Sequence, residues 1–318
     1  MRAARTFARC LADLSARAGR RLFEAVPPER LAGSRIVLGA YTLAYLVPRR
    51  RMFARVHRTD PVLFAPVGPV RVLRRPLPAP VADALVVAEL AAGTAFTLGL
   101  WHRVTGPVHA CLLLWTVSYR NSWSMIFHSD NTAVLHTLVA GFSPAADAWS
   151  VDALVRVRRG RPVPIPDWRY GYPAHVASAV TTVAYWLAGM AKIQGPLGWR
   201  WGTGDALRSQ VAADGLRKEV LGSSAAPLGK ALYPYRAPWT LAAAPSLALE
   251  LAAPAALLHP RIAQVWVASV FGMHWGIKAL MDITFRYQLS GAAYASFVPW
   301  DRLAGTARRL AGRRSRRR

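Results

Sequence analysis

Residues 81–101, VADALVVAELAAGTAFTLGLW, decide the fold class of this chain. The stretch holds two acidic residues, Asp83 and Glu89, and no basic residue. A bilayer core about 30 Å thick needs about 20 apolar residues per helix, so this length predicts a helix that crosses a membrane. Lipid offers no water to unpaired backbone groups, and we therefore expect helices rather than open strands.

Seven further apolar runs lie on either side of this one. They occupy residues 31–47, 104–119, 126–142, 173–193, 239–258, 262–283 and, more weakly, 285–300. The first run is short and is followed directly by Pro48 and Arg49. The pattern predicts an all-α, polytopic transmembrane helical bundle over residues 31–300, with seven to nine spans and eight favoured.

The segments outside the apolar runs are strongly basic. Residues 1–30 predict an amphipathic helix in the membrane interface, with a loosely ordered tail as the alternative. Its apolar side would consist of Phe7, Cys10, Leu11, Leu14 and Leu22. Residues 301–318 predict a basic cytoplasmic tail. Residues 194–236 form the largest remaining segment outside the membrane, with a helix expected over 205–220.

Composition excludes several classes of protein. The chain has 318 residues, of which 53% are apolar and 18% charged, and its mean hydropathy is +0.19. These values exclude the disordered, collagen-like and disulfide-rich secreted classes. The net charge of +25 comes from 37 arginines and four lysines against 16 acidic residues. The arginines gather in blocks beside apolar runs, which favours contact with anionic lipid headgroups over nucleic-acid binding.

The basic blocks bear on orientation in the membrane. Eight spans place both basic termini on one side, and the positive-inside rule makes that side cytoplasmic. The eight arginines of residues 49–75 would then lie outside, against the rule. Either this segment is re-entrant or the number of spans differs by one.

Ionisable residues inside an apolar span are costly in lipid and are usually functional or paired. Glu89 or Glu250 could form a structural ion pair with Lys278. The same three residues would suit the path of a transporter. Lys192 could extend to the interface, and we expect His136 to be a hydrogen-bonded core histidine. The metal-ligand spacings HExxH and CxxC do not occur, so we expect no metal site.

The most unusual segment joins two expected spans at residues 119–131, YRNSWSMIFHSDN. Trp123 and Phe127 offer faces for a flat ring, and Asn121, His128 and Asn131 offer hydrogen bonds. Such a pocket would suit a quinone. The alternative is an interfacial aromatic belt with capping Asn and Asp residues.

This segment also carries a family resemblance. Together with WSVDAL at 149–154, YWLAGMAK at 185–192 and GTGDAL at 202–207, it resembles the membrane domain of vitamin K-dependent gamma-carboxylase. It is similar as well to the short bacterial members of the horizontally transferred transmembrane (HTTM) domain family. Phe271-Gly272-Met273-His274 and Phe285-Arg286-Tyr287 fit the same pattern. The resemblance covers about residues 30–300.

The resemblance implies a quinol-oxidising enzyme of the carbon–carbon lyase family in a bacterial cytoplasmic membrane. Lys192 would deprotonate a reduced quinone (vitamin K or menaquinone hydroquinone), His128 would lie against the quinol oxygen, and O2 would be the co-substrate, without a metal. The substrate-binding residues would be Asn121, Trp123, Phe127, Asp130, Asn131, His274 and Tyr287. Membrane lipids, the quinol and a peptide or protein would be the partners, with no nucleic acid.

The chemistry of lysine agrees with this role. A lysine at the membrane end of an apolar helix loses hydration, which favours the neutral amine. Only a neutral amine can accept a proton from a hydroquinone, and an arginine, which stays charged, could not replace it.

The carboxylase's lumenal substrate portion has no counterpart after Trp300 in this sequence. We therefore expect oxygenase or epoxidase-type quinol chemistry rather than glutamate carboxylation. The alternatives are a non-catalytic membrane partner for maturation or export of a secreted peptide, and a transporter.

Overall fold

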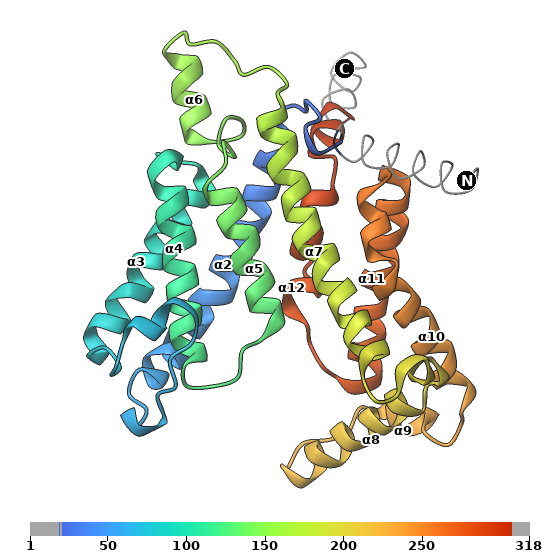
Figure 1. The fold of residues 1–318 in the computed structure, drawn as a ribbon. Helices are drawn as coiled ribbons and strands as arrows, with labels where there is room; N and C mark the ends of the chain where they lie inside the picture. Colours follow the sequence, from blue (N-terminus) through green and yellow to red (C-terminus); the bar gives the residue numbers. More distant parts are fainter. Residues whose placement is uncertain (1–18, 20, 307–318) are drawn as a thin grey trace, which may run out of the picture. The chain divides into compact units, whose positions relative to one another are not determined.

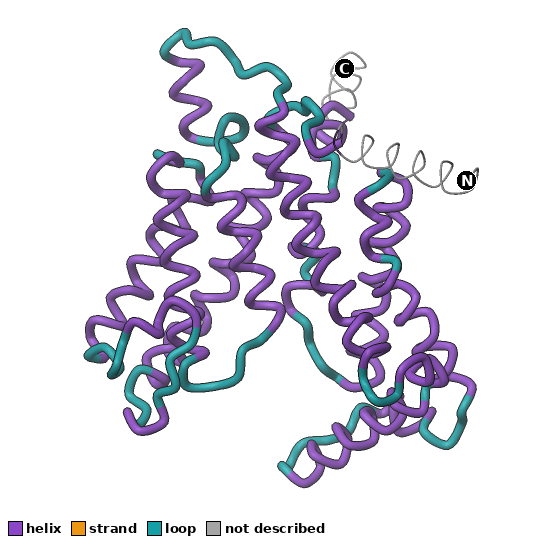
Figure 2. Tube along the Cα trace, in the orientation of Figure 1, coloured by secondary structure: helices purple, strands orange, loops and turns teal. Residues whose placement is uncertain are grey.

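The computed structural model describes residues 19 and 21–306, and within this part of the chain the fold is all-α (Figures 1 and 2). The one β contact in this part is a bridge between Val26 and Asp167. The α-helices are α2 Glu29–Val56, α3 Ala79–Leu98, α4 His102–Asn121, α5 His128–Gly141, α6 Val151–Arg158, α7 Trp168–Gln194, α8 Asp205–Val220, α9 Pro227–Leu232, α10 Ala237–Leu251, α11 Pro260–Met281 and α12 Arg286–Leu289. Short 3-10 helices are η1 Pro61–Leu63, η2 Gly68–Val72, η3 Gly198–Thr203, η4 Ala253–Leu257 and η5 Ala292–Phe297.

Three of these helices, α2, α3 and α7, are long and apolar enough to cross a membrane. Two parts of the prediction are thereby confirmed, namely the all-α class and the presence of helices long and apolar enough to cross a membrane. Most of the amphipathic helix expected over residues 1–30, and the tail beyond residue 306, lie outside the described residues.

The chain divides into two compact units, and α7 contributes to both. The first unit holds the described residues up to 177 together with 298–306, and the second holds 178–297. Each unit is described by itself.

Four helices, α2 to α5, form the bundle of the first unit. In sequence order each packs on the next, and α2 also packs on α5. Their shared core consists of Leu46, Phe53, Val86, Leu113, Val117 and Val134. This arrangement follows from apolar helices joined by short connections, which favour antiparallel neighbours.

The expected end of the first helix at Pro48 is wrong. Helix α2 continues to Val56 and is 28 residues long, which corresponds to about 42 Å at the usual rise per residue. Phe53 lies in the core with 1% of its surface exposed, so packing beyond the proline offsets the lost backbone hydrogen bond. Arg49, Arg50 and Arg51 therefore lie on the helix and not in a loop.

A buried arginine closes the turn between α3 and α4. Arg35 is completely buried, and its Nη1 donates to the carbonyls of Phe96 and Thr97, each at 3.0 Å. Its Nη2 donates to the carbonyl of Trp149 at 2.6 Å. The positive charge thus meets two of the last carbonyls of α3, at a helix C-terminus where a cation is favoured.

The second unit contains the end of α7 and helices α8 to α12. Its core consists of Trp201, Ala243 and Leu247, with Ile193 and Leu251 packed against it. The helix expected over 205–220 is confirmed as α8. Helices α10 and α11 begin two residues before the apolar runs that predicted them, and α10 gives way to η4 after Leu251.

The continuous helix expected over residues 285–300 is wrong. The segment consists of the four-residue α12 and of η5, separated by Ser290 and by Gly291, whose φ is +78°. This left-handed backbone suits glycine and ends α12. The segment is nevertheless deeply buried, since Tyr287 and residues 292–295 expose at most 3% of their surface.

Replacing Arg35 by lysine should destabilise the first unit, because the single ammonium nitrogen cannot occupy the positions of both Nη1 and Nη2, which reach carbonyls on two different segments. We expect a loss of about 2 kcal/mol, measured as thermal unfolding in detergent followed by tryptophan fluorescence. Arg50→Lys, at an exposed position of the same helix, is the control. Equal melting of the two variants would contradict the capping role.

Candidate functional site

A column of polar side chains runs along one face of α7 in the second unit. Ser178, Thr181, Tyr185 and Lys192 follow one another at intervals of three, four and seven residues, which places them on the same helix face. Ser178 Oγ lies 2.9 Å from Ser296 Oγ, and Thr181 Oγ1 donates to the Ala293 carbonyl at 3.0 Å. Ser178 and Thr181 therefore face the buried segment 285–297.

Two tyrosines and a histidine form the middle of the column. The hydroxyls of Tyr185 and Tyr294 share a hydrogen bond of 2.7 Å. Tyr185 Oη lies 3.3 Å from His274 Nδ1, which is itself 2.8 Å from the Val270 carbonyl. His274 is 4% exposed. Because a carbonyl oxygen only accepts, His274 Nδ1 carries a hydrogen that it donates to Val270, and the histidine and the two tyrosines form one polar cluster.

Lys192 ends the column in an ion pair with Glu250 of α10. Its Nζ lies 2.5 Å from both Glu250 carboxylate oxygens and 4.3 Å from the centre of the Trp201 ring. The Lys192 side chain is 24% exposed and that of Glu250 is 8% exposed. Gly189 permits this approach, because a Cβ there would lie 3.0 Å from Glu250 Cβ.

The expected pairing of Glu89 or Glu250 with Lys278 is wrong. Lys278 pairs with Asp282 at 2.9 Å, and this hydrogen bond lowers the pKa of Asp282. Asp282 follows the last turn of α11 four residues after Lys278, so it is the nearest carboxylate. Glu250 instead pairs with Lys192. The Lys192 ammonium is therefore held by a carboxylate, and the alternative in which this side chain only extends to the interface is wrong.

Glu89 has a partner that the sequence analysis missed. Its Oε1 lies 2.9 Å from His109 Nδ1, and both side chains are completely buried in the first unit. The ring of Phe96 lies 4.7 Å from that of His109. The sequence could have predicted this contact, because Glu89 and His109 lie at similar distances before and after the α3–α4 turn and so face each other on antiparallel helices. His136, as expected, is a buried histidine, 2.9 Å from the Ala177 carbonyl.

The segment predicted to bind a quinone contains a closed polar cluster in the first unit. Asp130 Oδ2 accepts from Arg120 Nη2 at 2.7 Å and from the Tyr45 hydroxyl at 3.1 Å. Arg120 also donates to Tyr45 Oη and to Asn121 Oδ1, and its guanidinium lies 5.2 Å from the Phe127 ring centre. Asn121 and Asp130 are thus held by Arg120 and Tyr45, two residues that were not among the predicted site residues.

The remaining predicted residues are divided between the two units. Trp123 packs on Phe64 with ring centres 5.1 Å apart, while His128 at the start of α5 and Asn131 are exposed. These three belong to the first unit, whereas Lys192, His274 and the fully buried Tyr287 belong to the second. Joint action of His128 and Lys192 on one quinol stays a prediction. In the described part of the chain, no three His, Cys, Asp or Glu residues gather as metal ligands would.

Comparisons with known proteins found no match to a family model, to a curated protein or to a solved structure. The resemblance to the gamma-carboxylase membrane domain therefore rests on the sequence motifs alone. The geometry of the polar side chains described above is therefore the basis for proposing a function.

The close approach of α7 and α10 can be tested at Gly189. An alanine there would also place its Cβ 3.1 Å from the Leu251 backbone nitrogen. Alanine normally stabilises a helix by about 1 kcal/mol over glycine, and the crowding at residue 189 should cancel this gain or reverse it.

Gly272→Ala is the matched control, because a Cβ at that position of α11 meets nothing within 4 Å. We expect a higher melting temperature for Gly272→Ala than for Gly189→Ala in detergent. Equal stabilisation by both substitutions would argue against tight packing at the Lys192–Glu250 pair.

Proposed function

We propose that the chain is a multi-pass protein of a bacterial cytoplasmic membrane with eight passages. Helices α4 and α11, with 20 and 22 residues, resemble in length the three helices that are apolar enough to cross. The eighth passage would be the broken segment 285–297, which runs along α7 in the second unit. Non-helical backbone is tolerated at membrane depth only when protein covers it, and the burial of this segment agrees with that requirement.

The activity we propose is proton abstraction from a reduced quinone at the Lys192–Glu250 pair, leading to oxygenase or epoxidase-type chemistry with O2. The observation that carries the proposal is this pair at the end of a polar column in an otherwise apolar helix. Such groups are costly in lipid and usually serve function. The buried ring of Trp201 beside the pair fits an aromatic diol.

In this proposal the lysine and the glutamate act as one unit. With Lys192 as an ammonium and Glu250 as a carboxylate, the carboxylate accepts the hydroxyl proton of the quinol. The ammonium then stabilises the negative charge that develops on the quinol oxygen. The base is therefore Glu250, and Lys192 acts as its charged partner, which differs from the role of sole base that the family resemblance implies for Lys192. His128 and O2 keep the roles that the resemblance implies.

Purified protein in detergent should consume oxygen when reduced menaquinone or vitamin K is supplied. Lys192→Arg should keep the ion pair but slow the reaction by about 100-fold or more, because the larger, planar guanidinium cannot place its charge where the Lys192 ammonium stabilises the quinol oxygen. Glu250→Gln should slow it similarly, since the amide accepts no proton. An oxygen electrode measures the rates.

Lys230→Ala is the matched control, because Lys230 lies in the same unit with 68% of its side chain exposed. Lys192→Ala, the variant matched to this control, should lose oxygen uptake. The proposal would be contradicted if the wild-type protein took up no oxygen, or if Lys192→Ala and Lys230→Ala had equal rates. Addition of a glutamate peptide and labelled carbon dioxide tests carboxylation separately. Proton-coupled flux into liposomes that Glu250→Gln slows, without quinol oxidation, would favour transport.

A further inference from the structure

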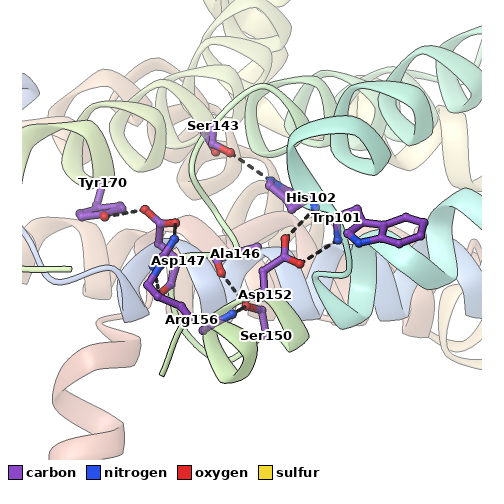
Figure 3. A network of polar contacts seen from close by, with 10 residues as sticks. Trp101, His102, Ser143, Ala146, Asp147, Ser150, Asp152, Arg156 and Tyr170 are labelled. Atoms are coloured by element: carbon purple, nitrogen blue, oxygen red, sulfur yellow. Dashed lines mark hydrogen bonds and ion pairs between the residues drawn. The ribbon is translucent and has the colours of Figure 1, made fainter. Parts of the chain in front are cut away.

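A large cavity away from the polar column lies in the first unit and has a volume of about 920 Å³. Its walls come from the start of α4, the end of α5, helix α6 and the start of α7. Neither the resemblance nor the proposed quinol chemistry uses this cavity. Figure 3 shows the polar network around it.

The acidic groups of this cavity are already bound by the protein. Asp152 accepts hydrogen bonds from the backbone nitrogens of Trp101 and His102, both at 2.8 Å (Figure 3). Its carboxylate thereby occupies the N-terminus of α4, a position that favours negative charge. Asp147 accepts from Arg156 Nη2 and from the Tyr170 hydroxyl, both at 2.7 Å. Neither carboxylate needs a cation from outside.

Positive charge exceeds negative charge in the lining. Five arginines line the cavity against two aspartates, namely Arg103, Arg156, Arg159, Arg161 and Arg169. Arg156 pairs with Asp147, and Arg169 pairs with Asp167 at 3.1 Å. Arg103, Arg159 and Arg161 make no ion pair with any residue in the described part of the chain. Three guanidinium groups are thus available to an anion.

The same cavity has an apolar wall. Val104 and Phe142, which are 63% and 65% exposed, line it together with Pro107. Trp101, 72% exposed, stands beside them, as expected of a tryptophan at a membrane–water interface. At the start of α4 the buried His102 Nδ1 lacks a hydrogen-bond partner among the described residues. Basic and apolar walls side by side fit a ligand that is anionic at one end and apolar at the other.

We propose that this cavity binds a phosphate group, with Arg103, Arg159 and Arg161 as its ligands. Guanidinium groups match phosphate oxygens in geometry and charge. The phosphate belongs either to the headgroup of an anionic lipid or to a soluble phosphate ester, and the apolar wall favours the lipid. The proposal does not depend on quinol chemistry.

Ligand-induced stabilisation of the full chain in detergent tests the site. The probes are dihexanoyl phosphatidic acid, dihexanoyl phosphatidylcholine and inorganic phosphate, each titrated while thermal unfolding is followed. We expect phosphatidic acid to raise the melting temperature and phosphatidylcholine, whose net charge is zero, to have little effect. Stabilisation by inorganic phosphate as well would identify a soluble phosphate ester as a sufficient ligand.

The combined variant Arg103→Gln, Arg159→Gln and Arg161→Gln should bind phosphatidic acid about 100-fold more weakly, at about a fivefold loss per arginine. These side chains are exposed, so the variant should fold. The matched control is Arg50→Gln, Arg51→Gln and Arg55→Gln, which removes the same charge from exposed positions on α2. Equal weakening in both variants, or no stabilisation of wild type by either phosphate-bearing anion, would overturn the proposal.

Discussion

Charge inside an apolar helical bundle must be compensated where it is buried, and this constraint organises both units of the protein. A buried charge without a partner costs several kcal/mol. Arg35, Glu89, Asp130 and Glu250 all lie in buried positions, and each meets a basic side chain or several carbonyl oxygens. Each of these contacts also joins two different helices, so the same contacts that compensate the polar groups fix which helices are neighbours.

These buried contacts differ in whether their polar side chains remain accessible to a bound molecule. The cluster of Arg120, Asp130 and Tyr45 is closed, with every partner supplied from inside the first unit. The Lys192–Glu250 pair is different, because a quarter of the lysine side chain is exposed, and Tyr185, which contacts His274 and Tyr294, lies about two turns before Lys192 on α7. For this reason the pair, rather than the polar segment before α5, carries the functional proposal.

The apolar runs predicted most helices to within a few residues, because helix formation in an apolar segment is a local property. Helices α3, α4 and α11 are examples. The continuation of α2 past Pro48 could not be predicted in this way, since it depends on the packing of Phe53 against other helices. The partner of Lys192 was missed for a related reason. Sequence spacing places residues on a helix face, but it does not tell which helix that face meets.

The segment 285–297 has a consequence for how the protein is assembled in the membrane. A segment without continuous helical hydrogen bonding cannot partition into lipid alone, because its exposed amide groups would cost several kcal/mol each. The carbonyl of Ala293, for example, is satisfied by Thr181 of the preceding helical framework. The ribosome completes α7 at residue 194, about 90 residues before this segment begins at residue 285. In the proposed eight-passage topology, this final crossing must therefore wait at the insertion machinery until earlier helices are in place to cover it.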